Sequence, residues 1–158
     1  MTCAHISLLF SVAVHLPYSH VTALDLSNDA LSVARENAAI NHVKKRVMPL
    51  HSDLLSSVAG QAFDVVVSNP PYVEEGTRLA PEIARHEPAA ALYAGLDGLA
   101  VVRRLVAQAG EGGADFLALE VGAGQAIAVE ELARAAGFER TERRADLAGV
   151  DRVVVAWR

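Results

Sequence analysis

The sequence Phe63-Asp-Val-Val-Val-Ser-Asn-Pro-Pro-Tyr72 is the stretch that says most about the fold. Its apolar first part, residues 63–68, predicts a strand buried on both faces, which is typical of a parallel sheet covered by helices. The tetrapeptide Asn69–Tyr72 follows this strand directly. In open α/β sheets, ligands bind beyond the carboxyl ends of the strands, so we expect the chemistry of this protein at Asn69–Tyr72.

Expected strands and helices alternate at short spacing on both sides of this stretch. Further strands are expected at residues 20–25, 46–50, 115–120, 138–144 and 152–157, and helices at residues 6–14, 27–41, 99–109 and 125–136. A strand is the alternative for residues 6–14, and residues 73–97 are expected to be a loop. This alternation predicts an α/β fold with a mainly parallel sheet. The last two strands predict an antiparallel hairpin around Gly149.

The composition indicates one folded domain of 158 residues, 52% of them hydrophobic. Fourteen Lys and Arg against 19 Asp and Glu give a net charge of −5, which excludes a globally basic nucleic-acid binder. No long uninterrupted apolar run predicts a membrane span. The single cysteine, Cys3, favours a reducing, cytoplasmic location. The six histidines show no paired ligand spacing, so we expect no metal site.

The tetrapeptide Asn69–Tyr72 is suited to binding a planar NH₂ group. The two prolines fix the backbone and carry no N–H group, so the Asn69 side-chain oxygen and the Pro70 carbonyl remain as acceptors. Tyr72 adds an aromatic face. The nitrogen of an amide or exocyclic amine is a poor nucleophile, and binding both of its hydrogens can orient its lone pair toward an electrophilic carbon. A rigid turn that simply leaves the strand is the alternative interpretation.

Asn69–Tyr72 resembles the substrate motif of class I S-adenosylmethionine-dependent methyltransferases that act on planar nitrogens. The rest of the chain resembles one family of that class, the peptide-chain release factor glutamine methyltransferases (HemK/PrmC). The matching segments are His86-Glu-Pro88, Ala91-Leu92, Gly95-Leu-Asp-Gly-Leu99, Glu120-Val-Gly122 with Gln125, and Asp146-Leu-Ala-Gly-Val-Asp-Arg152. Their order and spacing together make the resemblance specific.

The resemblance implies a Rossmann-like class I methyltransferase sheet with a C-terminal antiparallel hairpin. The implied reaction is methyl transfer from S-adenosylmethionine to a glutamine side-chain amide nitrogen of a release factor. That protein substrate is the implied partner, in the cytoplasm, with no membrane and no direct nucleic-acid binding. The implied catalytic residues are Asn69, Pro70, Pro71 and Tyr72.

The resemblance also implies which residues bind the cofactor. Asp25 would accept hydrogen bonds from the ribose hydroxyls, Asp53 and Leu54 match the segment near the adenine, and Asn69 is shared with the substrate site. Judged without the family, Asp25 could equally be an acid that begins a helix. Ser52-Asp53 would then be an ordinary turn.

The arginines near the C-terminus are interspersed with acidic residues. We therefore expect mostly a solvated surface and no RNA-binding patch at Arg134, Arg140, Arg143, Arg144, Arg152 and Arg158.

The N-terminal part departs from the family pattern. Family members begin with a helical domain, followed by a first strand and a glycine-rich loop. All eleven glycines of this chain lie at or after Gly60, and residues 3–14 align with the helix that should follow that loop. We therefore expect residues 1–158 to be a single, partial catalytic domain: a C-terminal fragment, or the product of a gene with a lost or misassigned start. Such a chain should bind the cofactor weakly.

Two other functions remain open from the sequence. One is an inactive methyltransferase remnant. The other is an amino-methylating DNA methyltransferase of permuted order, in which Glu120-Val-Gly-Ala-Gly-Gln125 would be the cofactor loop, because it follows a strand and opens a helix. Ile127 stands where the third glycine of the full pattern would be, and few residues remain after it.

Overall fold

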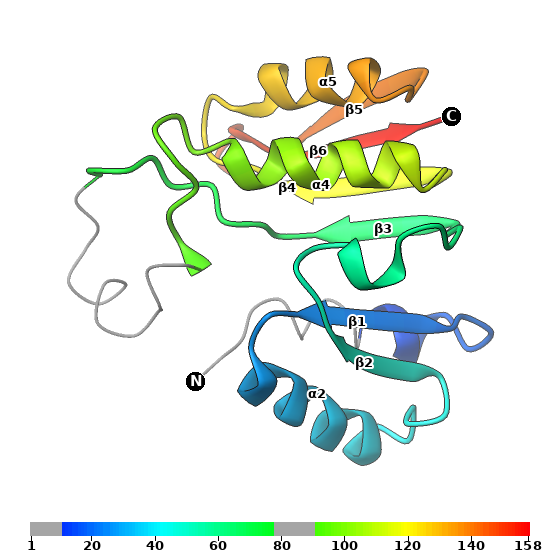
Figure 1. The fold of residues 1–158 in the computed structure, drawn as a ribbon. Helices are drawn as coiled ribbons and strands as arrows, with labels where there is room; N and C mark the ends of the chain where they lie inside the picture. The colour runs from blue at the N-terminus through cyan, green and yellow to red at the C-terminus, as the bar shows by residue number, and fades with distance from the viewer. Residues whose placement is uncertain (1–10, 78–90) are drawn as a thin grey trace. The chain divides into compact units, whose positions relative to one another are not determined.

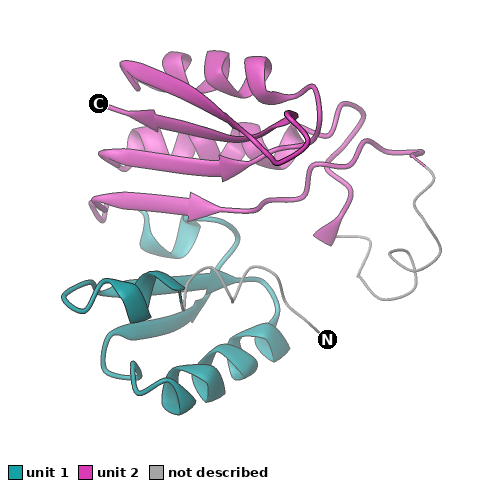
Figure 2. Cartoon of the chain, turned by 180° about the vertical axis from the view of Figure 1, so that it is seen from behind, with its two compact units in different colours: residues 1–59 teal, residues 60–158 magenta. Residues whose placement is uncertain are grey.

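A computed structural model of the protein describes residues 11–77 and 91–158. The chain divides into two compact units, unit 1 (residues 1–59) and unit 2 (residues 60–158), shown in Figure 2. Strands and helices alternate in both units. The predicted α/β class is therefore confirmed.

Unit 1 is built on two parallel strands. β1 (Val21–Asp25) and β2 (Val47–His51) pair in parallel, and α2 (Asn28–Ile40) connects them. A short 3-10 helix, η1 (Ser56–Val58), follows β2. Residues 11–15 are helical, as predicted for the end of the 6–14 segment, and residues 6–10 lie outside the described residues.

The sequence of α2 accounts for its boundaries and its packing. The Ser27 side chain caps the helix by accepting a hydrogen bond from the Ala30 N–H, as predicted. Leu31, Ala34 and Ala38 are buried on one face. The core of unit 1 consists largely of small side chains, which allow the helix to approach the strands closely.

Unit 2 contains a four-stranded sheet in the order β3-β4-β6-β5. Its strands are β3 (Val65–Ser68), β4 (Phe116–Glu120), β5 (Arg140–Ala145) and β6 (Asp151–Trp157). β3 and β4 are parallel, whereas β6 is antiparallel to both β4 and β5. The helices α4 (Ala100–Glu111) and α5 (Ala126–Ala135) lie on the same face of this sheet (Figures 1 and 2). The predicted C-terminal hairpin is confirmed.

Two details differ from the sequence predictions. The prediction that β3 is buried on both faces is wrong, because Val65 is 52% exposed. β3 forms an edge of the four-stranded sheet, so its side chains have fewer neighbours than those of an inner strand. The second difference is that α4 continues through Gly110 to Glu111. Gly110 serves close packing there, since a Cβ atom would lie 2.4 Å from the Ala136 carbonyl oxygen.

The predicted loop is described only at its two ends. Residues 73–77 and 91–97 are joined there by a parallel bridge between Val73 and Tyr93. His86–Pro88, one of the segments that carry the family resemblance, lies outside the described residues. Over the described ranges, we find no helix with the length and hydropathy needed to cross a membrane.

Candidate functional site

Asn69–Tyr72 leaves the carboxyl end of β3. β3 and β4 are parallel, with Ser68 opposite Leu119, so the residues that follow both strands lie at the same end of the sheet. This edge, at the carboxyl ends of the parallel strands, differs from the side of the sheet that β3 forms as its outer strand. β6 runs the other way, so its first residue, Asp151, lies at that edge as well. Pro70 is buried, and the other three residues of the tetrapeptide are half-buried. All four predicted catalytic residues therefore occupy the edge at which α/β sheets bind ligands.

Backbone hydrogen bonds hold the chain directly after the two prolines. The Val73 N–H donates to the Leu92 carbonyl oxygen at 2.9 Å, and the Ala94 N–H donates to the Val73 carbonyl oxygen at 2.8 Å. The Asn69 side chain, by contrast, forms no hydrogen bond with any residue of 11–77 or 91–158. None of these described residues therefore competes with a ligand for the Asn69 amide group.

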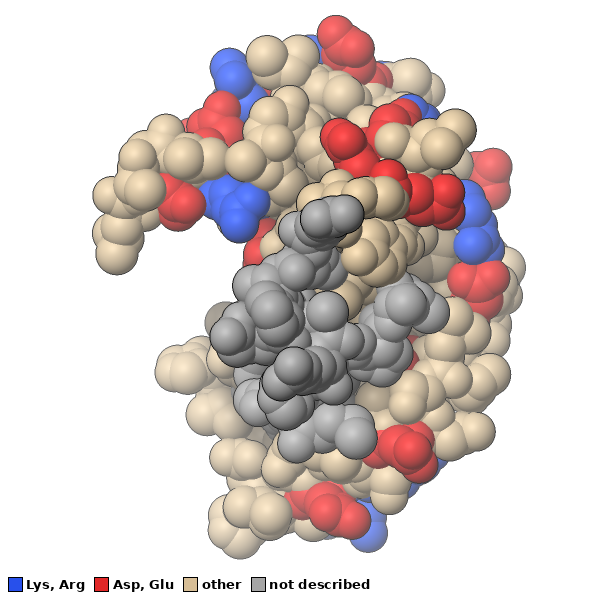
Figure 3. All heavy atoms as spheres, turned by 90° about the vertical axis from the view of Figure 1, so that its left-hand side faces the viewer, with Lys and Arg blue, Asp and Glu red and all other residues tan. Residues whose placement is uncertain are grey.

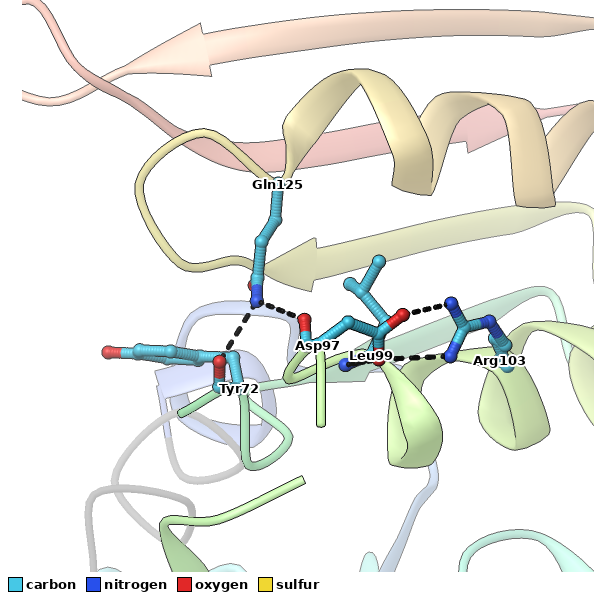
Figure 4. Close-up of polar contacts among 5 residues, drawn as sticks. All are labelled: Tyr72, Asp97, Leu99, Arg103 and Gln125. Atoms are coloured by element: carbon cyan, nitrogen blue, oxygen red, sulfur yellow. Dashed lines mark hydrogen bonds and ion pairs between the residues drawn. The ribbon is translucent and has the colours of Figure 1, made fainter. Parts of the chain in front are cut away.

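The Gln125 side chain links three loops at this edge (Figure 4). Its Oε1 accepts a hydrogen bond from the Gly122 N–H at 2.9 Å. Its Nε2 donates to the Tyr72 carbonyl oxygen at 2.9 Å and lies 3.4 Å from the Asp97 carbonyl oxygen. One amide thus connects the segment after β3, the segment before α4 and the turn after β4.

The Tyr72 ring lies beside an arginine from β6. The guanidinium carbon of Arg152 is 5.8 Å from the ring centroid, within the range of a cation–π interaction. Arg152 Nη1 also donates to the Val121 carbonyl oxygen at 3.3 Å. Arg152 does not lie in the solvated surface that its charged neighbours in the sequence predict, because it is half-buried and packs against Tyr72.

Asp97 fixes the segment that leads into α4. Both of its carboxylate oxygens pair with Arg103, and Oδ1 also accepts a hydrogen bond from the Leu99 N–H at 3.1 Å. The Arg103 guanidinium and then the Leu99 N–H lower the pKa of Asp97 to about 2. Asp97 is exposed, so this contact orders the loop and does not create a buried charge.

The other arginines of the C-terminal region are mostly paired with acids. Arg134 and Arg143 both contact Glu130, at 3.6 Å and 3.3 Å, and Arg144 contacts Glu142 at 3.1 Å. On the face shown in Figure 3, the described basic and acidic side chains are interspersed and form no continuous basic surface.

In unit 1, Asp25 lies at the carboxyl end of β1. Its Oδ1 accepts a hydrogen bond from the Ser27 N–H at 2.8 Å, so it does help to begin α2. Both of the interpretations that the sequence left open are therefore compatible with this position. The Ser52 N–H donates to the Asp25 carbonyl oxygen at 3.1 Å, which brings the turn after β2 next to the end of β1.

That turn contains Asp53 and Leu54. Leu54 adopts a φ of 53°, a left-handed conformation that costs a bulky side chain energy. Buried Ser52 holds the turn: its hydroxyl donates to the Leu54 carbonyl oxygen at 2.8 Å and accepts from the Ser57 N–H at 3.1 Å. Strain of this kind clusters at functional sites, which makes this turn a candidate for ligand binding.

Sequence reasoning missed three contributors to these sites, namely Gln125 as a link between loops, buried Ser52, and Arg152 against Tyr72. A possible signal for the first was the glutamine directly before a helix and after a glycine turn. The same contact weakens the permuted interpretation, because the Gly122 N–H is already bonded to Gln125 and is not free for a cofactor. Among the described residues, no group of three or more His, Cys, Asp or Glu side chains could hold a metal ion.

Comparisons with known proteins agree on methyltransferases. The model of a family described as methyltransferase small domain matches residues 3–111. The release factor glutamine methyltransferase of Caulobacter vibrioides is 41% identical over 94% of this chain and 53% of its own length. That of Deinococcus radiodurans is 42% identical over 96% of this chain and 54% of its own length. The chain thus spans about half the length of these curated relatives.

Solved structures are similar in fold. The catalytic domain of human METTL16 with an RNA hairpin matches with a TM-score of 0.72 and 14% identity, over 97% of this chain and 60% of that chain. The E. cuniculi Mtq2–Trm112 complex matches with a TM-score of 0.57 and 18% identity, over 96% and 93%. These likenesses confirm the predicted class I methyltransferase fold.

Proposed function

Since this chain belongs to the methyltransferase small domain family, we propose that it transfers a methyl group to a glutamine side-chain amide nitrogen of a peptide-chain release factor. The observation that carries the proposal is the position of Asn69–Tyr72, directly after β3, with an Asn69 amide that bonds to no other described residue. The names of the relatives at 41% and 42% identity support the same substrate.

We propose that Asn69 and Pro70 bind the acceptor amide. The Asn69 side-chain oxygen and the Pro70 carbonyl would each accept one hydrogen of the substrate NH₂ group, and Tyr72 would flank the reacting atoms. Positioning of this kind can contribute about 7–11 kcal/mol to catalysis in favourable cases. The residues would therefore act by orienting the nitrogen, with no covalent enzyme intermediate.

The reaction would be a direct in-line displacement. The amide nitrogen forms a bond to the methyl carbon, and the carbon–sulfur bond of the methyl donor breaks with its electron pair going to sulfur. The nitrogen then loses one proton to solvent, and the products are an N-methylated glutamine and S-adenosylhomocysteine. The activated methyl group is what S-adenosylmethionine supplies.

We propose that Asp25, Asp53 and Leu54 bind S-adenosylmethionine, together with Asn69. Asp25 Oδ1 is bonded to the Ser27 N–H, and its carboxylate retains further acceptor capacity for ribose hydroxyls. The strained turn at Leu54 is held in one conformation by Ser52, as a binding turn requires. A structural neighbour, the N-terminal domain of human METTL16, was solved with S-adenosylhomocysteine, at a TM-score of 0.64 and 13% identity.

We also propose that both units belong to one catalytic domain. The family match over residues 3–111 crosses the boundary between residues 59 and 60, which supports this arrangement. A release factor as substrate would place the protein in the cytoplasm, where translation ends.

Mass spectrometry of the product tests the proposed substrate. The chain is incubated with methyl-labelled S-adenosylmethionine and either a bacterial release factor or duplex DNA. The full-length Caulobacter vibrioides relative serves as the positive control. We expect one methyl group on a glutamine side chain of the release factor. A methylated base, or an unmodified release factor where the relative modifies it, would contradict the proposal.

A further inference from the structure

The segment Asn69–Tyr72 has few anchors of its own. Pro70 and Pro71 carry no N–H group, so between β3 and Val73 the backbone can be held only through its carbonyl oxygens and the two remaining N–H groups. The Gln125 Nε2 atom donates to one of those carbonyls, that of Tyr72, at 2.9 Å. It is therefore the side-chain contact best placed to fix the end of the tetrapeptide.

Gln125 is itself held in one orientation. Its Oε1 accepts from the Gly122 N–H, so the two ends of the amide have different partners and the group cannot be flipped without losing both bonds. A carbonyl oxygen on one side and an N–H on the other require a side chain that both donates and accepts. Glutamine provides a donor and an acceptor at this length without depending on its protonation state, whereas an ionised glutamate can only accept.

Two glycines provide the space for this contact. A Cβ atom at Gly98 would lie 2.3 Å from the Tyr72 carbonyl oxygen and 2.6 Å from Gln125 Nε2. A Cβ atom at Gly122 would lie 2.8 Å from Gln125 Oε1 and 3.3 Å from Tyr72 Cδ2. Gly98 precedes α4 and Gly122 follows β4. The close approach of Gln125 to Tyr72 therefore depends on a glycine in each of two loops.

The Tyr72 ring is held from another direction. Arg152 lies over it at 5.8 Å and is anchored to the Val121 carbonyl oxygen. Tyr72 is thus fixed by its carbonyl group and by its ring, through residues that precede α5 and begin β6. Both anchors lie outside the tetrapeptide.

We infer that Gln125 is a positioning residue for the acceptor-binding segment Asn69–Tyr72. By holding the Tyr72 carbonyl, it keeps the Asn69 side chain and the Pro70 carbonyl aimed at the substrate amide, without touching the substrate itself. The inference rests on the proposed function of that segment. Loss of the Gln125 side chain should lower the rate of methyl transfer, and it should weaken S-adenosylmethionine binding less, because Asn69 is only one of the proposed cofactor-binding residues.

The variant Gln125→Glu tests this role. It retains an oxygen for the Gly122 N–H, lacks the donor for the Tyr72 carbonyl, and adds one negative charge. Gln61→Glu, at an exposed position of the same unit, is the matched control for that charge. If Gln125→Glu does not fold, Gln125→Met takes its place, because methionine is a side chain of similar length that forms no strong hydrogen bond.

The first measurement is hydrogen exchange, which does not depend on activity. We expect the Val73 and Glu75 amides to exchange about 3- to 10-fold faster in the Gln125 variant, as loss of one hydrogen bond implies. Amides of β4 and β6 should keep the exchange rates of the control. Unchanged exchange at Val73 and Glu75, or equal acceleration throughout unit 2, would overturn the inference.

The second measurement is kinetic. We expect kcat to fall about 10- to 100-fold, because a small misplacement of reacting groups slows a reaction by this much. The Kd for S-adenosylmethionine should rise by a smaller factor, because the proposed contacts of Asp25, Asp53 and Leu54 do not depend on Gln125. A kcat equal to that of the Gln61→Glu control would overturn the inference. If the unsubstituted chain transfers no methyl group, only the proposed function is contradicted. Hydrogen exchange then still decides whether Gln125 positions the segment.

Discussion

Replacing Gly98 with alanine should destabilise unit 2 through a backbone collision. Gly98 has a φ of +67°, and a left-handed conformation costs an alanine about 1–2 kcal/mol. The new methyl group would also lie 2.3 Å from the Tyr72 carbonyl oxygen. Overpacking of this kind typically lowers the free energy of unfolding by a further ~1–3 kcal/mol. We therefore expect Gly98→Ala to lower the free energy of unfolding by about 2–5 kcal/mol.

Gly113→Ala is the matched control. Gly113 has nearly the same φ, +70°, but beyond its two chain neighbours no other residue has an atom within 4 Å of the position of its Cβ atom. It should therefore lose only the conformational contribution, about 1–2 kcal/mol. Urea unfolding followed by the fluorescence of Trp157 measures both variants, because this single tryptophan lies in β6 and stacks on Phe116. Equal losses in the two variants would refute the collision, and with it the close approach of Gly98 to Tyr72.

Three further predictions concern particular side chains. Asp25→Asn keeps an oxygen for the Ser27 N–H but loses the carboxylate. Calorimetric titration should therefore show S-adenosylmethionine binding weakened by about 1.5–3 kcal/mol. The control Asp29→Asn, on the first turn of α2, should bind S-adenosylmethionine as the unsubstituted chain does. Ser27→Ala removes the cap of α2 and should cost about 0.5–2 kcal/mol of stability in thermal or urea unfolding. An unchanged stability would show that the cap contributes nothing. The pKa of Asp97 is lowered to about 2, so its contribution to stability is present above its unfolded pKa near 4 and is lost as the pH falls toward 2. The stability difference between the unsubstituted chain and Asp97→Asn should therefore shrink steadily over that pH range, and a difference as large at pH 2 as at pH 7 would contradict this assignment.

Local features of the sequence predicted the secondary structure well. The cap at Ser27 and the buried face of α2 depend on residues three and four positions apart, which the sequence displays directly. The hairpin around Gly149 has the same local origin. The burial of β3 could not be predicted in this way. An apolar run shows that a strand is suited to burial, but the exposure of Val65 depends on which strands lie beside it.

The candidate site was predictable only in part. Asn69–Tyr72 was recognisable because its residue types and its place after a strand are both visible in the sequence. The hydrogen bond from Gln125 to Tyr72 joins residues 53 positions apart, so no local sequence pattern predicts it. The conformation of Leu54 is likewise invisible in the sequence, since leucine is an unfavourable residue for a positive φ and the turn depends on buried Ser52.

The rate of methyl transfer by Asn69→Ala tests most directly whether Asn69–Tyr72 binds the acceptor amide. The control is Asn41→Ala, at the C-terminal cap of α2. Both are assayed with a release factor and S-adenosylmethionine, alongside urea unfolding. Loss of one oriented polar contact at a reacting centre should slow Asn69→Ala by about 10²- to 10³-fold, with little change in stability. Asn41→Ala should retain its rate. Methyl transfer by Asn69→Ala at the rate of the unsubstituted chain would contradict the account.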